Sequence, residues 1–187
     1  MATLSADQIS FLRSQGISPA QVFDASKSAS KAVRDVEMEA LDLYFYFGGS
    51  PCQKGGHSLR TKAGHCIQCD HAKIAYQLRS SAAGYVYLAY SKKNSLVKVG
   101  FTKNMPQERV VFLIKENYAN SNDWSLKRSI KYDKDAGKKE FEIHSYLEKY
   151  LFPISYEKNK GQLIICREVF SCALDIALNA FSKVTGK

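Results

Sequence analysis

The sequence lacks any segment that could span a membrane. No apolar run approaches the roughly 18 to 20 residues that a transmembrane helix needs. The first residues, Met1 to Asp7, lack both the basic start and the apolar stretch of a secretory signal. From these two absences we expect a cytoplasmic protein with no membrane contact.

Acidic side chains are scarce. The 187 residues include 18 acidic and 27 basic side chains, which gives a net charge of +9. Residues 1–49 carry more acidic than basic groups, so the positive excess belongs to the rest of the chain. Such an excess favours a polyanionic partner, although a soluble basic surface would show the same balance. A hydrophobic content of 45% excludes a wholly disordered chain.

The five cysteines do not form an even set, which argues against a disulfide framework. Three of them lie close together in the chain beside a histidine, in the order Cys52, His57, Cys66 and Cys69. Two close pairs of this kind are the spacing of a tetrahedral zinc site. Gly55 and Gly56 would let the backbone fold back far enough for His57 to reach the ion.

This zinc ion would be structural, because four protein ligands leave no open position for water or substrate. His65 and His71 are competing ligands. Basic side chains in this segment, and one further along the chain, are candidate contacts to a nucleic-acid backbone. They are Lys54, Arg60, Lys62 and Lys103.

Upstream of the zinc segment the sequence favours short helices. Ser5 and Gln8 have the spacing of a capping box, which predicts a first helix. Ser18-Pro19 predicts the start of a second helix that carries Val22 and Phe23.

A third helix is expected over residues 27–43, with an apolar face that includes Val33 and Val36. The aromatic run at residues 44–47 could stack on nucleic-acid bases. Packing of a small domain onto its neighbour is the interpretation we favour.

From residue 84 the pattern changes to β-structure. Residues 84–90 and 96–100 predict a β-hairpin, and residues 124–132 predict a third strand. The other expected elements are a helix that includes Arg109, a helix over residues 140–151, a strand over residues 161–166 and a last helix over residues 170–181.

The fold class is therefore α+β. We expect a small, mostly antiparallel three-stranded sheet flanked by helices, preceded by an α-helical region and a small zinc-binding module. The expected boundaries are 1–49 for the helical region, 50–83 for the zinc module with a linker helix, and 84–187 for the sheet domain.

Five short motifs follow one another along the sheet domain. They are Tyr85-Val86-Tyr87, Lys98-Val99-Gly100, Arg109, Glu140-Phe141-Glu142-Ile143-His144 and Arg167-Glu168-Val169-Phe170. In this order they resemble the GIY-YIG nuclease superfamily, specifically the phage and bacterial branch in which lysine replaces the second signature tyrosine. The resemblance covers residues 84–172. Phe101 and Val169 depart from the family pattern, which leaves the substrate preference open.

The resemblance implies a metal-dependent endonuclease that hydrolyses nucleic acid, and we expect DNA rather than RNA. Glu140 would hold Mg²⁺ or Mn²⁺, and Arg109 would bind phosphate oxygens. Tyr87 would be the general base, helped by a nearby cation such as Lys98, or Lys98 would be the base itself. His144 accompanies the site and could bind phosphate.

Each of these residues also has a structural explanation. Glu140 and Glu142 lie at a helix N-terminus, where the helix dipole favours acidic side chains, and Glu142 is a rival metal ligand. The alternative to a nuclease is therefore a catalytically inactive, zinc-stabilised protein that binds DNA or RNA. A protein-interaction adaptor that uses the N-terminal helices is a third hypothesis. One active centre cuts one strand, so the oligomeric state, a homodimer included, stays open.

Overall fold

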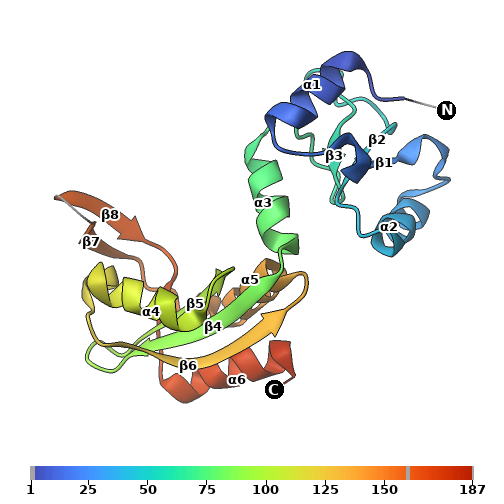
Figure 1. Cartoon of the computed structure of the whole chain (residues 1–187). Coiled ribbons are helices and arrows are strands. Elements are labelled where there is room, and N and C mark those ends of the chain that lie inside the picture. The colour runs from blue at the N-terminus through green and yellow to red at the C-terminus, as the bar shows by residue number, and fades with distance from the viewer. Residues whose placement is uncertain (1–2, 159–160, 187) are drawn as a thin grey trace. The chain divides into compact units, whose positions relative to one another are not determined.

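The computed structural model describes residues 3–158 and 161–186 of the chain. The chain divides into two compact units, Met1–Arg79 and Ser80–Lys187, each built around its own sheet (Figure 1). None of the helices in these described residues combines the length and the apolar character that crossing a bilayer requires.

A short three-stranded sheet organises the N-terminal unit. Its strands are β1 (Val22–Asp24), β2 (Phe45–Phe47) and β3 (Arg60–Thr61), with β1 parallel and β3 antiparallel to β2. The sheet takes strands from both sides of residue 49, so the N-terminal region and the zinc segment share one core. That core contains Leu12, Ile17, Val22, Phe45, Phe47, Leu59, Ile67 and Ile74.

The capping box at the start of the chain is confirmed. Helix α1 (Ala6–Ser14) begins after Ser5, whose hydroxyl accepts from the Gln8 N–H at 3.2 Å. The Gln8 side chain accepts in return from the Ser5 N–H at 2.9 Å. The expectation that the aromatic run packs is confirmed, because all three residues of β2 are less than 9% exposed. Phe45 and Phe47 pack within the core of this unit itself.

The prediction of a second helix over Val22 and Phe23 is wrong. Ser18 caps only a single 3-10 turn, Pro19–Gln21, and Val22 and Phe23 then pair with β2 as a parallel strand. β-branched and aromatic side chains suit a paired strand. Pairing with a segment more than twenty residues away has therefore prevailed over the local helix signal.

The third helix, α2 (Lys31–Ala40), turns the opposite face inward from the one expected. Val33 is 43% exposed and Val36 is 70% exposed, whereas Met38 is fully buried. Arg34 is also buried, with its guanidinium carbon 4.1 Å from the centre of the Tyr46 ring. A guanidinium stacked on an aromatic ring and bonded to polar partners can replace an aliphatic side chain in a core.

In the C-terminal unit the main sheet has the strand order β6-β4-β5-β9, with every pair antiparallel. The strands are β4 (Gly84–Ser91), β5 (Leu96–Thr102), β6 (Trp124–Tyr132) and β9 (Val169–Ser171). The α+β class and the antiparallel sheet are confirmed. The short β9 adds a fourth strand to the three expected.

Helices lie on both faces of this sheet. They are α4 (Pro106–Lys115), α5 (Ala136–Leu147) and α6 (Leu174–Thr185). Side chains of α4 pack with Tyr87 and Ala89 on one face, and side chains of α5 and α6 pack with Val86 and Leu88 on the other. Strand β4 is therefore buried on both faces.

The remaining elements are peripheral to the main sheet. The predicted strand at residues 161–166 is β8 (Gln162–Cys166), which pairs with β7 (Ile154–Lys158) as a separate two-stranded sheet. Helix α3 (Ala72–Ser81) follows the zinc segment. Short 3-10 turns cover Tyr118–Asn120 and Glu148–Tyr150.

Candidate functional site

The four predicted zinc ligands converge. The ligand atoms of Cys52, His57, Cys66 and Cys69 all lie within 4.8 Å of one another. The Cys52 and Cys69 sulfurs are 3.6 Å apart, and the His57 Nδ1 is 3.3 Å from the Cys69 sulfur and 3.8 Å from that of Cys66. Zn–S bonds of about 2.3 Å in a tetrahedron place neighbouring sulfurs about 3.7 Å apart. The cluster could therefore hold a zinc ion through three thiolates and Nδ1 of His57.

The backbone around Cys52 makes this convergence possible. Cys52 donates its N–H to the His57 carbonyl at 2.8 Å, and Gly55 donates its N–H to the Cys52 sulfur at 3.3 Å. A Cβ at Gly55 would lie 2.7 Å from a carbon of the His57 ring, and Gly56 has a left-handed φ of +65°. The two glycines thus let the histidine ring close over the loop, as the sequence predicted.

The competing histidines lie outside the cluster. His71 packs its ring against Phe11, with the ring centres 5.4 Å apart, and His65 is exposed. Within the cluster, burial favours the neutral thiol of Cys52, but the N–H donors of Gly55 and His57 outweigh it and lower the pKa of Cys52 to about 6. That loop therefore favours the thiolate form that a metal requires.

Two of the three basic side chains near the cluster have partners inside the N-terminal unit. Arg60 donates to the carbonyls of Gly64 at 3.0 Å and Ser50 at 2.8 Å, which joins the two zinc loops. Lys62 forms an ion pair with Glu39. Lys54 is exposed, as is Lys103 in the C-terminal unit. Arg60 thus has a structural role that the sequence did not indicate.

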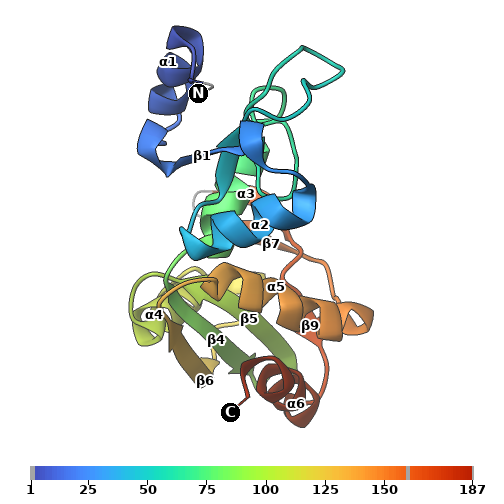
Figure 2. The same cartoon turned by 90° about the vertical axis from the view of Figure 1, so that its right-hand side faces the viewer.

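In the C-terminal unit, helix α5 covers an open edge of β5. Strand β9 pairs only with the segment from Leu96 to Lys98, and α5 runs across the rest of β5 (Figure 2). There the Glu140 carboxylate accepts from the Phe101 N–H at 3.1 Å, and the His144 Nε2 lies 3.0 Å from the Val99 carbonyl oxygen. Glu140 and His144 are four residues apart, so they project from the same side of the helix.

Tyr87 reaches the same stretch of β5 from the neighbouring strand. It pairs directly with Gly100, and a Cβ at Gly100 would lie 2.6 Å from the Tyr87 hydroxyl. The absence of a side chain at Gly100 therefore lets the tyrosine ring cross β5 next to Phe101, which anchors Glu140.

Lys98 lies two residues before Gly100 and is 2% exposed. Its Nζ is 2.9 Å from a Glu168 carboxylate oxygen and 3.2 Å from the Tyr118 hydroxyl. The Tyr118 hydroxyl also accepts from the Cys166 thiol at 2.8 Å, and burial raises the pKa of Tyr118. The ammonium group is therefore held by a carboxylate and a phenol.

Tyr118 and Glu168 were not expected as partners of Lys98. Glu168 belongs to the motif at residues 167–170, so the sequence did mark it as a candidate residue. Tyr118 lies between Asn117 and Ala119, which both have left-handed φ values, of 47° and 54°. A left-handed alanine has no sequence signature, and nothing in the pattern could have predicted that this loop turns a tyrosine into the core.

Arg109 belongs to α4, the helix that packs on the face of the sheet that carries Tyr87. Its guanidinium carbon lies 4.9 Å from the centre of the Phe112 ring. Thr102, Asn104, Glu108, Arg109 and Phe112 line a hollow of about 230 Å³. Arg109 and Glu168 both influence the pKa of Tyr156, which burial raises, so the arginine and the carboxylate that pairs with Lys98 lie near one tyrosine.

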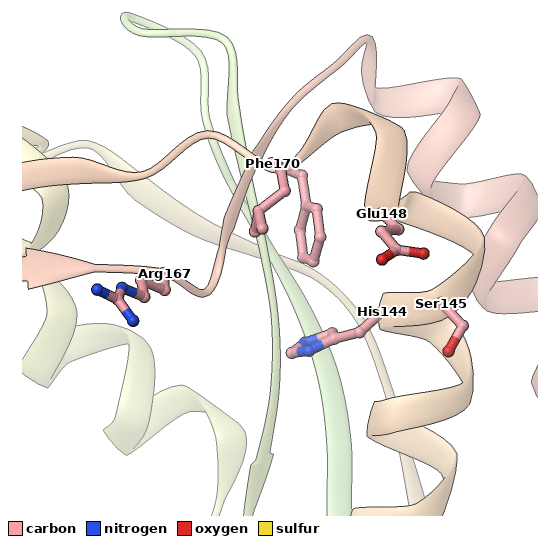
Figure 3. Close-up of a pocket in the computed structure, with 6 residues that line it drawn as sticks. His144, Ser145, Glu148, Arg167 and Phe170 are labelled. Carbon is pink, nitrogen blue, oxygen red and sulfur yellow. The ribbon is translucent and has the colours of Figure 1, made fainter.

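A second hollow, of about 250 Å³, opens beside His144 (Figure 3). Arg167, Glu148 and Phe170 also line it, and Figure 3 shows His144 reaching in from α5 while Arg167 comes from the segment after β8. Burial lowers the pKa of His144, although the hydrogen bond to Val99 and the nearby Glu140 oppose this shift. Because a carbonyl oxygen only accepts, Nε2 carries the hydrogen and Nδ1 of the neutral ring carries a lone pair.

The structure thus gathers Tyr87, Lys98, Glu140 and His144 along β5. Glu142 points elsewhere. Its carboxylate pairs with Lys139 at 2.8 Å and influences the pKa of Tyr132, on the far strand of the sheet. The geometry therefore favours Glu140 over Glu142 as the carboxylate of this site.

Zinc binding can be tested with Cys66→Ser. Washed wild-type protein is expected to contain about one zinc ion per chain, and the variant to lose it and unfold at a lower temperature, because structural zinc supplies on the order of 10 kcal/mol. Metal analysis and thermal unfolding check both. His65→Ala, outside the cluster, is the matched control and should keep its zinc. A metal-free wild type with the melting temperature of the variant contradicts the assignment.

The half-buried His144 should make stability depend on pH. Its lowered pKa means that the unfolded chain binds a proton more readily than the folded one below about pH 6.5. Stability is then lost as the pH falls from there, by at most about 1.4 kcal/mol per pH unit. His144→Gln keeps an N–H that can reach Val99, and it should flatten the dependence. Urea unfolding at pH 7.5 and 5.5 measures this, and parallel losses in both proteins would refute it.

Comparison with protein families matches residues 84–185 to the T5orf172 domain, which is more than half of the chain. Comparison with curated proteins and comparison with solved structures returned no match. T5orf172 domains are nuclease-like domains, compatible with a protein that acts on nucleic acid. The matched segment contains the whole main sheet and every side chain gathered along β5, and the chain therefore belongs to the T5orf172 domain family.

Proposed function

We propose that this chain is a metal-dependent endonuclease of the GIY-YIG type, that DNA is its substrate, and that the zinc module assists binding. The observation that carries the proposal is the meeting of Tyr87, Glu140 and His144 on the three residues from Val99 to Phe101. The order of the sequence motifs and the membership of a nuclease-like family support it.

Glu140 is the group that would hold the catalytic cation. A carboxylate has about four lone-pair positions, so it can accept from Phe101 and also bind Mg²⁺ or Mn²⁺. When bound, such a cation polarises the scissile phosphate and offsets the charge that develops on it. Arg109 would bind the phosphate oxygens with its guanidinium fork.

The same geometry limits the roles of the other side chains. His144 is neutral near pH 7 because burial lowers its pKa, so it is suited to accept a proton through Nδ1 rather than to bind phosphate as a cation. Lys98 is an ion-pair partner of Glu168 on the face of the sheet that carries Tyr87. Tyr87 and Lys98 remain the two candidates for activating the attacking water.

The second candidate function is nucleic-acid binding without turnover. The observation that favours it is burial, since Tyr87 is 1% exposed, Lys98 is 2% exposed and Glu140 is fully buried. In that case the contacts of Glu140 and Lys98 would serve only to stabilise the sheet, and the basic surface would carry the function.

Nicking of supercoiled DNA separates the two functions. Wild-type protein with Mg²⁺ should convert supercoiled plasmid to open circles, and Glu140→Gln should lose at least about a hundredfold in rate, because it keeps an acceptor for Phe101 but removes the charge. Glu142→Gln, on the same helix, is the matched control and should cut normally. If all three proteins bind DNA but none cuts with Mg²⁺ or Mn²⁺, the binding function replaces the enzyme.

Arg109 gives an independent test of the phosphate site. Arg109→Ala should lower the rate of nicking about a hundredfold while leaving the zinc content unchanged. Lys115→Ala removes a positive charge from the same helix, α4, and should leave the rate within about twofold of wild type. Equal rates for Arg109→Ala and wild type would exclude this arginine from the site.

A further inference from the structure

Strand β6 contains a bulge at Lys127. Leu88 of β4 pairs with Arg128, while the next residue, Ala89, pairs with Leu126. Lys127 is therefore the extra residue that β4 leaves unpaired. Bulges of this kind often lie beside active sites, where they change the direction in which side chains point.

Because of the bulge, each side chain in the second half of β6 lies on the opposite face of the sheet from the one that strict alternation would give it. Before it, Trp124 and Leu126 pack into the cluster that contains Tyr87. After it, Ile130 and Tyr132 pack into the cluster on the other side of the sheet. Side chains alternate with a period of two, so without an extra residue all four would share one face. The neighbours of Ile130 in the chain, Ser129 and Lys131, therefore lie on the face of Tyr87.

Ser129 and Lys131 each pair with a tyrosine of β4. Ser129 pairs with Tyr87, which in turn pairs with Gly100. In the next row Lys131 pairs with Tyr85, which pairs with Thr102 on β5. Directly paired residues of antiparallel strands share a face, so each row crosses three strands over about 10 Å.

This end of the sheet face is open. Ser129 and Lys131 are exposed, and Tyr85 and Thr102 are partly exposed. Thr102 also lines the hollow that contains Arg109, so one continuous surface leads from Arg109 across Tyr85 to Lys131. We call it the β6 row surface.

Arg109 and Lys131 give this surface a positive charge, and Glu108 is an acidic residue that lines the same hollow as Arg109. Lys103 and Lys127 lie next to the surface in the chain. Among the ion pairs found in residues 3–158 and 161–186, none involves Lys103, Arg109, Lys127 or Lys131. Cations beside an exposed aromatic ring are the combination that binds a nucleic-acid strand, because the cations meet phosphates and the ring stacks on a base.

We propose that the β6 row surface binds the DNA strand that leads away from the cut, with Lys131 on a phosphate and the Tyr85 ring on a base. The inference deepens the proposed function and rests on it for the position of the cut. The bulge at Lys127 places Ser129 and Lys131 on the face of the sheet that carries Tyr87.

The test measures binding rather than cleavage. The full zinc-loaded chain is titrated into labelled single-stranded DNA, without added Mg²⁺, at 50 and 200 mM salt. Lys131→Ala should weaken binding about five- to tenfold at low salt and reduce the slope of log Kd against log salt by about one. Lys131→Arg should restore both values. Tyr85→Leu should weaken binding about tenfold with the salt slope unchanged.

Lys92→Ala is the matched control. Lys92 is exposed in the turn at the opposite end of the β4–β5 hairpin, so its loss removes the same charge away from the row. Equal affinity and salt slope for Lys131→Ala and Lys92→Ala overturn the inference. Binding of an RNA strand that depends on Lys131, with no such dependence for DNA, also overturns it.

The proposed DNA-binding surface and the proposed endonuclease activity can be refuted independently of each other. A protein that binds DNA through Lys131 and Tyr85 but never nicks plasmid supports the surface and refutes the endonuclease. A protein that nicks plasmid while Lys131→Ala and Tyr85→Leu bind like wild type supports the endonuclease and refutes the surface.

Discussion

The contact of α5 with the open edge of β5 is the constraint on which the C-terminal unit depends. Because β9 is only three residues long, the Val99 carbonyl and the Phe101 N–H have no strand partner on that side. A buried backbone group without a partner costs about 1–3 kcal/mol. His144 and Glu140 satisfy these two groups from successive turns of one helix. Their position is thus fixed by the hydrogen-bonding needs of the sheet, and any chemistry they perform uses side chains that the fold already holds rigidly.

The N-terminal unit is stabilised differently, because its sheet is very small. Its strands are two and three residues long, too short for a sheet to be stable alone. Ile67, between Cys66 and Cys69, is fully buried in the same cluster as Leu12 and Phe45. A metal ion held by the cluster would therefore stabilise the same few residues as the apolar core.

Features carried by neighbouring residues could be predicted from the sequence, and features that depend on distant partners could not. The capping box at Ser5, the ligand spacing around Cys66 and the β4–β5 hairpin are short-range patterns, and the structure contains each of them. The inward face of α2 was mispredicted because it depends on a Tyr46 ring that Arg34 meets only after folding. The bulge at Lys127 and the left-handed loop around Tyr118 escaped for the same reason, since each is imposed by pairing or packing elsewhere.

The closeness of the Tyr87 ring to Gly100 has a consequence for how this domain can change over time. Even a methyl group at position 100 would lie less than 3.0 Å from three atoms of the Tyr87 side chain, two ring carbons and the hydroxyl oxygen. A larger residue could be accommodated there only if position 87 first became small. The two positions, thirteen residues apart in the chain, are therefore expected to change together during evolution. A homologue that keeps the tyrosine needs glycine at position 100, whereas a homologue with a small residue at position 87 does not.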